Sequence, residues 1–396
     1  MSIKKKDIFL LADSVVDLRF IYEILKKKHN VTWVFYYKKN ISQAKDLGVL
    51  DKNIIFLNNK NILFLVKKIL QFPLNKLFGY SKINHEKELL RNIKKIDLKF
   101  KPDLWITDTA GILSKINTEK KKATFIHSVP YKKFFLNKNT LCYDYVFIPG
   151  DYHLNRILNF YHDKKKELRK KLIISPSPKI IPYIKQKNFF LKKSEFFKKY
   201  SLDNSRETVV LATTHNAFYN NRFLPKNFGS EAGALEELCQ RITSNNLNLI
   251  IKLHHYHHHK FSDKKFSFIK NFKNIHIFKP NKNFDSLHSE EVFFHSDIVI
   301  TDTSGVGPIC CYLGKKMIFL EPDQPFDWHS SDIEKNMRPG FIIKNKEDIY
   351  KALAKYKTTP LLFDKDRKDF TNSIFKYYND GSLSIIDKVV DEILNK

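Results

Sequence analysis

Short apolar runs of strand length alternate with stretches of helical periodicity along most of this chain, and this alternation constrains the fold more than any other feature. Residues 15–28 place Val16, Leu18, Ile21 and Leu25 at helical spacing directly after a first apolar run. Strands that alternate with helices form parallel sheets whose faces the helices cover. In the first part of the chain we expect strands at residues 7–12, 31–37, 53–57, 101–107, 123–127 and 145–148.

The alternation stops once, between residues 175 and 200, where three prolines and a charged helical stretch interrupt it. It resumes with runs at 208–212, 247–253, 276–278, 297–301 and 317–320. A length of 396 residues suits two domains. We expect an α/β protein with two Rossmann-like domains whose parallel sheets face a cleft. The expected parts are an N-terminal domain (1–180), a linker (181–200), a C-terminal domain (201–375) and a terminal helix (376–396).

The composition narrows the function classes. The 70 basic and 42 acidic residues give a net charge of +28, which favours an anionic partner. The lysines are spread over the whole chain and no nucleic-acid-binding signature is present, so we do not predict a nucleic-acid partner. A hydrophobic content of 42% excludes a disordered chain.

Cysteine usage and hydropathy indicate the compartment. The four cysteines lack the spacing of a zinc site or a disulfide framework, and Cys310 and Cys311 lie in an apolar run as expected of core residues. Every apolar stretch of about 18 residues contains a charge, so no membrane-spanning helix is predicted. The apolar run at 8–12 is too short for a signal peptide. We expect a cytoplasmic protein.

Ligands of open parallel sheets bind outside the carboxyl ends of the strands, and unusual polar residues fall at those positions. The sharpest segment is 295–308, where a buried strand ends in Thr301-Asp302 and is followed by Thr303, Ser304 and Gly305 before an apolar helical run. Backbone N–H groups at such a helix start bind phosphate. An ordinary turn capped by Asp302 or Thr303 explains the segment equally well.

A second segment, 249–259, ends a strand with Lys252 and His254, and five of its last six residues are histidines. A metal-binding tract is one interpretation. Neighbouring acidic or cysteine ligands are missing, so we favour phosphate contacts and predict no metal.

Three more strand ends carry candidate residues. His127 follows an apolar strand, where it is placed to act as a general base or to serve as a structural histidine. Thr214 and His215 follow the first strand of the second part. Near residues 319–325, Asp323 fits ribose hydroxyls or a turn cap.

In this order the segments resemble the CDP-glycerol:poly(glycerophosphate) glycerophosphotransferase family, the teichoic-acid primases and polymerases. The family's His-Gly-Thr-Pro-Leu-Lys segment is similar to residues 127–132, where His127, Pro130 and Lys132 match and Ser128 replaces the glycine. Its Trp-Asp-Tyr strand resembles residues 143–145.

The resemblance runs from about residue 100 to residue 345. Departures from the family pattern at Ser128, His215, Thr303 and Gly305 leave the donor and acceptor open. In the second part the similar segments are 212–216, Lys252-Leu-His254, 296–305, Pro322-Asp323 and Arg338-Pro-Gly-Phe341.

The resemblance implies a glycosyltransferase B architecture and a CDP-polyol as co-substrate, with no other cofactor. It implies that His127 deprotonates an acceptor hydroxyl, which attacks the donor β-phosphorus and expels CMP. By the same resemblance the phosphate- or nucleotide-binding residues are Lys252, His254, Thr303, Ser304, Gly305, Asp323 and Arg338. Lys132 and Asp108 are expected on the acceptor side, while Thr214 and His215 have no definite role.

The resemblance also implies an anionic polymer or a lipid-linked saccharide as acceptor, at the inner face of the bacterial membrane. Residues 62–78 are apolar with interspersed lysines, which fits a segment lying in a membrane interface. An ordinary amphipathic helix, broken at Pro73, is the alternative.

Two other function classes stay open. One is a nucleotide-sugar glycosyltransferase or a UDP-sugar 2-epimerase-like enzyme of the same fold. An epimerase needs carboxylates at the cleft, for which Asp108, Glu321 and Asp323 are the candidates. The other is a basic RNA- or lipid-binding protein, whose binding would depend steeply on salt.

Overall fold

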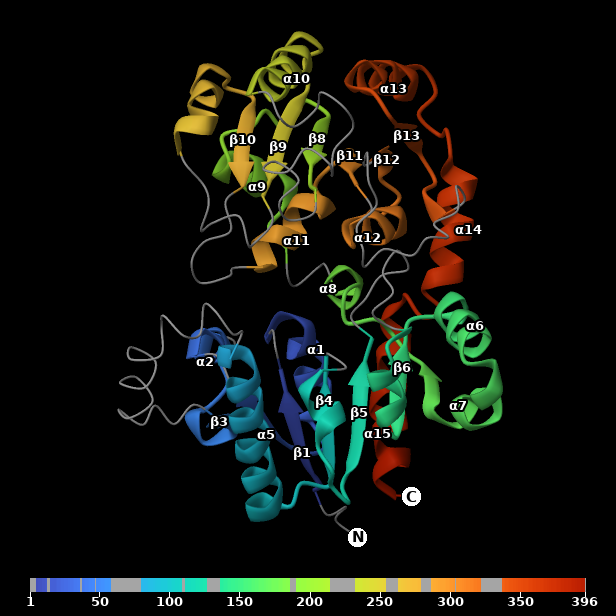
Figure 1. Ribbon diagram of the computed structural model, residues 1–396. Coiled ribbons are helices and arrows are strands. Elements are labelled where there is room, and N and C mark those ends of the chain that lie inside the picture. Colours follow the sequence, from blue (N-terminus) through green and yellow to red (C-terminus); the bar gives the residue numbers. More distant parts are fainter. Residues whose placement is uncertain are drawn as a thin grey trace.

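The computed structural model contains two parallel sheets, each covered by helices on both faces (Figure 1). It describes residues 5–12, 15–35, 38–46, 48–57, 80–108, 111–126, 136–185, 190–213, 232–253, 263–278, 286–302, 304–321 and 337–395. We call the seven-stranded sheet with its helices the first half and the six-stranded sheet with its helices the second half.

The first sheet has the order β3-β2-β1-β4-β5-β6-β7, and every neighbouring pair is parallel. The central strands are buried almost completely, as expected of a sheet covered on both faces. Its strands are β1 (Asp7–Leu11), β2 (Asn30–Phe35), β3 (Ile54–Phe56), β4 (Leu104–Thr107), β5 (Lys121–Phe125), β6 (Tyr145–Ile148) and β7 (Leu172–Ile174).

The second sheet has the order β10-β9-β8-β11-β12-β13 and is also parallel throughout. Its strands are β8 (Thr208–Leu211), β9 (Asn248–Lys252), β10 (Ile275–Phe278), β11 (Ile298–Thr301), β12 (Lys316–Leu320) and β13 (Phe341–Ile343). The predicted fold class is therefore confirmed. The sequence pattern missed β7 and β13, whose apolar runs of three residues are one residue shorter than the run at 54–57 that marks β3.

Helices cover both faces of the first sheet. One face packs against α1 (Val15–Leu25) and α15 (Ser384–Asn395). The other packs against α5 (Tyr80–Phe100), α6 (Asp151–Phe160) and α7 (Lys165–Lys171). The first half also contains α2 (Lys38–Asp46), next to β2 and β3.

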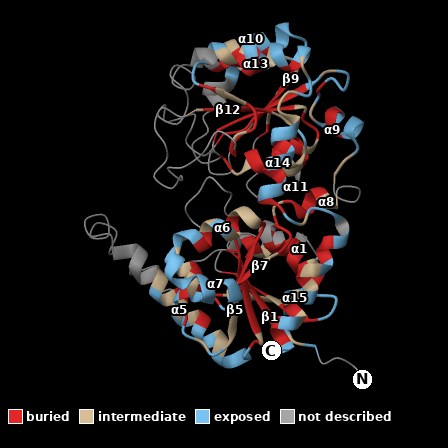
Figure 2. Ribbon diagram, turned by 90° about the vertical axis from the view of Figure 1, so that its right-hand side faces the viewer, coloured by how far each residue is buried: buried red, intermediate tan, exposed pale blue. Residues whose placement is uncertain are grey.

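The second sheet is covered in the same way. One face packs against α10 (Ala232–Ser244) and α13 (Lys346–Thr358), the other against α9 (Lys193–Lys199), α11 (Ser286–Phe294), α12 (Val306–Tyr312) and α14 (Asp364–Ile374). Cys310 and Cys311 are buried in the second of these clusters, which confirms their prediction as core residues. The short helix α8 (Ile181–Ile184) lies between the halves (Figure 1). Figure 2 shows buried residues gathered in both sheets and on the inward faces of their helices.

The C-terminal helix returns to the first half. Ile386, Val390 and Ile393 of α15 are buried in the same cluster as α1, and both chain ends lie in the first half (Figure 1). The terminal helix begins at Ser384 rather than near residue 376, because a 3-10 turn at Asp380–Leu383 precedes it. The expected boundaries 1–180, 181–200, 201–375 and 376–396 stay predictions.

A close backbone contact joins the halves where α6 begins. Gly150 precedes α6, and Lys376 N–H donates to the carbonyl oxygen of Pro149 over 2.9 Å. A Cβ at Gly150 would lie 2.5 Å from the carbonyl oxygen of Ile374, at the end of α14. The two main chains therefore approach as closely as they do because residue 150 has no side chain.

We expect Gly150→Ala to lower the free energy of unfolding by about 1–3 kcal/mol, because neither main chain can move away without disturbing α6 or α14. Urea unfolding followed by circular dichroism measures this. Gly381→Ala is the matched control, since its Cβ would approach no atom closer than 3.7 Å. Equal stabilities of the two variants would contradict the close approach.

Candidate active site between the two sheets

The strand order places a topological switch point in each sheet. From β1, the chain of the first half builds outward through β2 and β3, then returns to β4 on the other side. The second half does the same from β8, with β11 on its other side. Loops that leave two neighbouring strands in opposite directions open a crevice at their carboxyl ends, where ligands of doubly wound sheets bind. The crevices therefore lie beyond β1 and β4, and beyond β8 and β11.

Hydrogen bonds fasten the two central strands of the second half at this point. Ala212 N–H donates to Ile300 over 2.9 Å, and the Thr301 hydroxyl donates to the carbonyl oxygen of Ala212 over 2.6 Å. The next residues, Thr213 and Asp302, are 4% and 0% exposed. The Thr213 hydroxyl makes no hydrogen bond within the described residues. The residues directly beyond the ends of β8 and β11 are therefore polar and buried, and hydrogen bonds pair the strands up to them.

The start of α12 forms the next part of this edge. Ser304 is buried, its hydroxyl accepts a long hydrogen bond of 3.4 Å from Val306 N–H, and its carbonyl oxygen accepts one of 3.1 Å from Gly307 N–H. Gly305 has ordinary right-handed helical angles, so the glycine is not needed for a left-handed conformation. The residue at the start of α12 is Gly305, and it makes no side-chain capping bond. The capped-turn alternative named Asp302 or Thr303, but Gly305 holds the cap position, and Thr303 lies outside the described residues.

Lys252 is the last residue of β9, next to β8 at the same sheet edge. Its side chain is partly buried, and Nζ lies 5.4 Å from the centre of the Phe293 ring of α11. Burial lowers the pKa of this ammonium to about 8. Burial takes the ammonium group partly out of water, which makes its charged form less stable. An anionic ligand bound at this sheet edge stabilises that charge, so the position suits anion binding.

Arg338 precedes β13 by three residues, and its guanidinium pairs with Glu321, the residue that follows β12. The Arg338 side chain is only 11% exposed, and its Nε makes no hydrogen bond within the described residues. The predicted phosphate-binding cation is thus already neutralised by a carboxylate in this structure. To bind a phosphate, it has to share or exchange that partner.

On the facing sheet, Asp108 follows β4 directly and is 2% exposed. Burial raises the pKa of the neighbouring Tyr143 phenol, and the negative charges of Cys142 and Asp108 raise it further. Ile126, which precedes His127, donates its N–H to Phe147 of β6 over 2.9 Å. The pairing of β5 with β6 therefore extends to Ile126, the residue before His127.

The structure places Lys252, Ser304 and Gly305 at the carboxyl edge of the second sheet, and Asp108 at that of the first. Arg338 precedes β13, and its guanidinium reaches Glu321 at the carboxyl end of β12. The other candidates lie outside the described residues: His127, Lys132, Thr214, His215, His254, Thr303 and Asp323, together with segment 62–78.

An ion pair between the halves was not predicted from sequence. Arg19 of α1 donates from Nη2 to Oε2 of Glu290 on α11 over 2.6 Å, and both side chains are largely buried. The available signal was the position of Arg19, a charged residue between Leu18 and Phe20 within an apolar helix. That signal indicates a buried partner but does not identify it.

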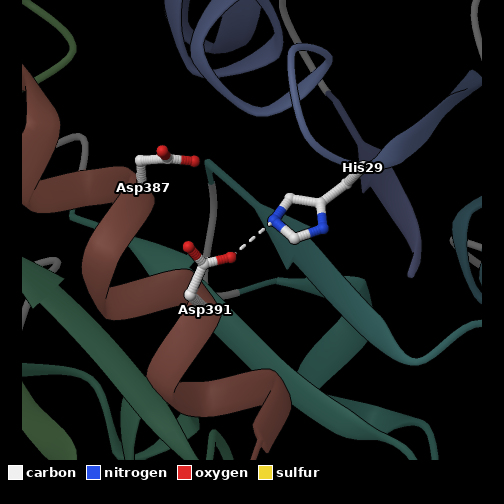
Figure 3. A group of neighbouring side chains, drawn as sticks. All are labelled: His29, Asp387 and Asp391. Carbon is white, nitrogen blue, oxygen red and sulfur yellow. Dashed lines mark ion pairs between the residues drawn. The ribbon is translucent and has the colours of Figure 1, made fainter. Parts of the chain in front are cut away.

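One group of side chains has the composition of a metal site (Figure 3). His29 Nε2 lies 3.0 Å from Asp391 Oδ1, and Asp387 lies one turn earlier on α15. The Lys28 ammonium already lies 2.5 Å from Asp387 and 3.0 Å from Asp391, and these carboxylates raise its pKa. His29 precedes β2, at the sheet edge opposite to the crevice. We therefore assign this cluster to the attachment of α15, and the absence of a catalytic metal stays a prediction.

Within the described residues, no helix is long and apolar enough to cross a membrane.

A family model described as CDP-Glycerol:Poly(glycerophosphate) glycerophosphotransferase matches residues 105–395. A search of curated proteins found no match. The resemblance drawn from the motifs is confirmed by the family match.

Solved structures show the same fold at low sequence identity. The wall teichoic acid polymerase TagF aligns over 99% of this chain and 90% of its own, with 15% identity and a TM-score of 0.64. UDP-GlcNAc 2-epimerase from Neisseria meningitidis aligns over 98% of this chain and 99% of its own, with 12% identity and a TM-score of 0.63. Both have the glycosyltransferase B architecture, which confirms the predicted arrangement of two Rossmann-like bodies.

We expect Thr301→Val to lower the free energy of unfolding by about 1–3 kcal/mol, because the buried carbonyl of Ala212 loses its side-chain donor while the side-chain shape is kept. Chemical denaturation measures the change. Thr301→Ser is the control, since it keeps the hydroxyl. A valine variant as stable as the serine variant would show that this bond does not fasten the two strands.

Proposed function

Because this chain belongs to the CDP-glycerol:poly(glycerophosphate) glycerophosphotransferase family and is an enzyme of that type, we propose that it transfers glycerol phosphate from CDP-glycerol to an acceptor hydroxyl and releases CMP. The acceptor is a surface polymer or a lipid-linked saccharide. Such an acceptor would bring the enzyme to the inner face of the membrane, with residues 62–78 as the candidate contact.

The observation that carries this proposal is the position of Lys252 and Ser304 at the switch point of the second sheet. Switch-point crevices of doubly wound sheets hold nucleotides. One TagF structure was obtained with a CDPG soak, which supports a cytidine-type donor in a chain of this fold. We therefore place the nucleotide and its diphosphate in the second half and the acceptor in the first.

The described residues support phosphate binding through charge and hydrogen-bond donors. Lys252 neutralises a diphosphate oxygen, and Ser304 supplies a hydroxyl beside Gly305. Arg338 contributes when its guanidinium is shared between Glu321 and the donor. Of the residues outside the described part, His254 and Thr303 complete the phosphate contacts and Asp323 takes the ribose. Thr214 and His215 follow β8 in the sequence, and we assign them no role.

The reaction is an in-line displacement. His127 takes the proton of the acceptor hydroxyl as its oxygen bonds to the β-phosphorus of CDP-glycerol. The bond between this phosphorus and the bridging oxygen breaks, and CMP leaves with that oxygen. Histidine suits this role because its ordinary pKa is close to neutrality. Phosphoryl transfer otherwise needs positioning and neutralised oxygens, which the cations supply without a further cofactor. Lys132 and Asp108 orient the acceptor.

A nucleotide-sugar transferase or a UDP-sugar 2-epimerase is the second candidate, since an epimerase matches the fold as well as TagF does. Of the cleft carboxylates that an epimerase needs, Glu321 is engaged by Arg338. The choice of nucleotide in a binding experiment separates the two candidates.

We expect Lys252→Met to weaken CDP-glycerol binding by about 10- to 100-fold, the loss expected for one charge-assisted hydrogen bond. Thermal stability should be kept or raised, because the variant removes a buried charge. Calorimetry with CDP-glycerol, CDP-ribitol and UDP-N-acetylglucosamine measures affinity and donor class. Binding of the UDP-sugar alone would replace the proposed function with the second candidate.

We expect His127→Gln to lower kcat by about 100- to 10,000-fold while the Kd for CDP-glycerol changes little, because a general base acts on the acceptor and not on donor binding. CMP release and calorimetry give the two values. An unchanged kcat would exclude His127 as the base, and a matching loss of donor affinity would make it a binding residue.

A further inference from the structure

A buried group of charges lies between the two halves, next to the proposed donor site. Arg19 on α1 and Glu290 on α11 form an ion pair of 2.6 Å, with exposed side-chain fractions of 4% and 16%. These helices belong to different halves and face each other (Figure 1). Glu290 and Phe293 lie one turn apart on α11, and the Lys252 ammonium lies over the Phe293 ring. We call Arg19, Glu290 and Lys252 the interhalf charge cluster.

Three neighbouring groups, besides desolvation, act on the pKa of Lys252. Besides desolvation, which lowers the pKa of Lys252, the neighbouring cation Lys179, which follows β7, lowers it. Glu290 on α11 and Cys310 on α12 raise it. Burial raises the pKa of the Cys310 thiol far above its usual range, so this thiol carries no charge near neutrality. Among the described residues, Glu290 is therefore the neighbour whose charge favours the ammonium form near neutrality.

The Glu290 carboxylate thus interacts with two cations, Arg19 of the first half and Lys252 of the second half. Its attraction to Lys252 favours the charged form of that side chain. Its ion pair with Arg19 spans the interface, so the pair depends on how close the halves are. When Arg19 holds Glu290, the carboxylate still favours the charged form of Lys252, and no ion pair of Lys252 is formed with another described residue.

We propose that Glu290 is a positioning residue that links the two halves through Arg19 and keeps the Lys252 ammonium charged and available for the donor diphosphate. This inference rests on the proposed function, because it takes Lys252 as a donor contact. Glu290 itself touches no substrate. It makes donor affinity depend on the approach of the halves, since separation from Arg19 removes a cation that competes with Lys252 for the carboxylate.

The test is the pH dependence of CDP-glycerol binding between about pH 7 and pH 10, measured by calorimetry on the full chain. A lowered lysine pKa means that the ammonium is lost as the pH rises through about 8, so wild-type affinity should fall there. In Lys252→Arg this fall should disappear, because a guanidinium keeps its proton over the whole range.

Two further variants should move the fall in opposite directions. Glu290→Gln removes the carboxylate and should move it to lower pH, by about half to one pH unit. Arg19→Met removes a cation that competes for Glu290, so the carboxylate attracts Lys252 more strongly and the fall should move to higher pH. Binding at pH 7 should be weaker, because the ammonium is then engaged by the carboxylate. A purely structural ion pair would weaken binding in both variants without moving the fall.

Glu291→Gln is the matched control, since Glu291 is adjacent on α11 but accepts from the Leu191 N–H over 2.9 Å. It should leave the pH of the fall unchanged. If Arg19→Met does not purify as a folded protein, Arg19→Gln replaces it.

The outcomes separate the two levels of inference. If Lys252→Met binds CDP-glycerol as tightly as wild type, the phosphate contact in the proposed function is wrong. If the fall exists and disappears in Lys252→Arg, but Glu290→Gln does not move it or moves it in the same direction as Arg19→Met, only the role of Glu290 is overturned.

Discussion

Parallel strand pairing is the constraint on which the rest of this structure depends. Because every strand of both sheets is parallel, all carboxyl ends of a sheet lie along one edge. Residues that are distant in sequence, such as Thr213 and Asp302, come together at that edge because β8 and β11 are paired. The same pairing buries the strands on both faces, so polar groups concentrate at the ends. The candidate site follows from these two consequences.

The contacts between the halves decide how the two edges can cooperate. The main chain crosses between them more than once: α14 ends against Gly150, and α15 returns to the first sheet. The contact at Gly150 lies just beyond the carboxyl end of β6 and includes a main-chain hydrogen bond and the exposed ion pair of Lys376 with Asp151. The helix α15 packs against the first half with an apolar face. The ion pair of Arg19 and Glu290 lies near the strand ends and is buried. A buried pair contributes little net stability compared with apolar groups but specifies geometry, which suits an interface beside a reaction site.

The described cations of the site are not free positive charges. Arg338 is held by Glu321, and Lys252 lies within the field of Glu290. A chain with a net charge of +28 has many exposed lysines that attract polyanions without selectivity. Buried cations that are paired with carboxylates instead bind only a ligand whose anionic groups reach them in the correct geometry. The fold does not determine which ligand binds, since TagF and a UDP-GlcNAc 2-epimerase have the same architecture. Ligand specificity therefore depends on the residues at the strand ends.

The sequence by itself determined the elements and the edge at which function lies. Short apolar runs such as 208–211 and 298–301 indicate buried strands. The local pattern was therefore enough to predict parallel sheets with polar residues at the strand ends. It also carried the motifs around His127 and Lys252 that match the family. Tertiary structure alone decided the strand order, the return of α15 to the first half, the partner of Arg338 and the pairing of Arg19 with Glu290. These features depend on contacts between residues far apart in sequence and on burial that only the packed halves create, and no local pattern records either one.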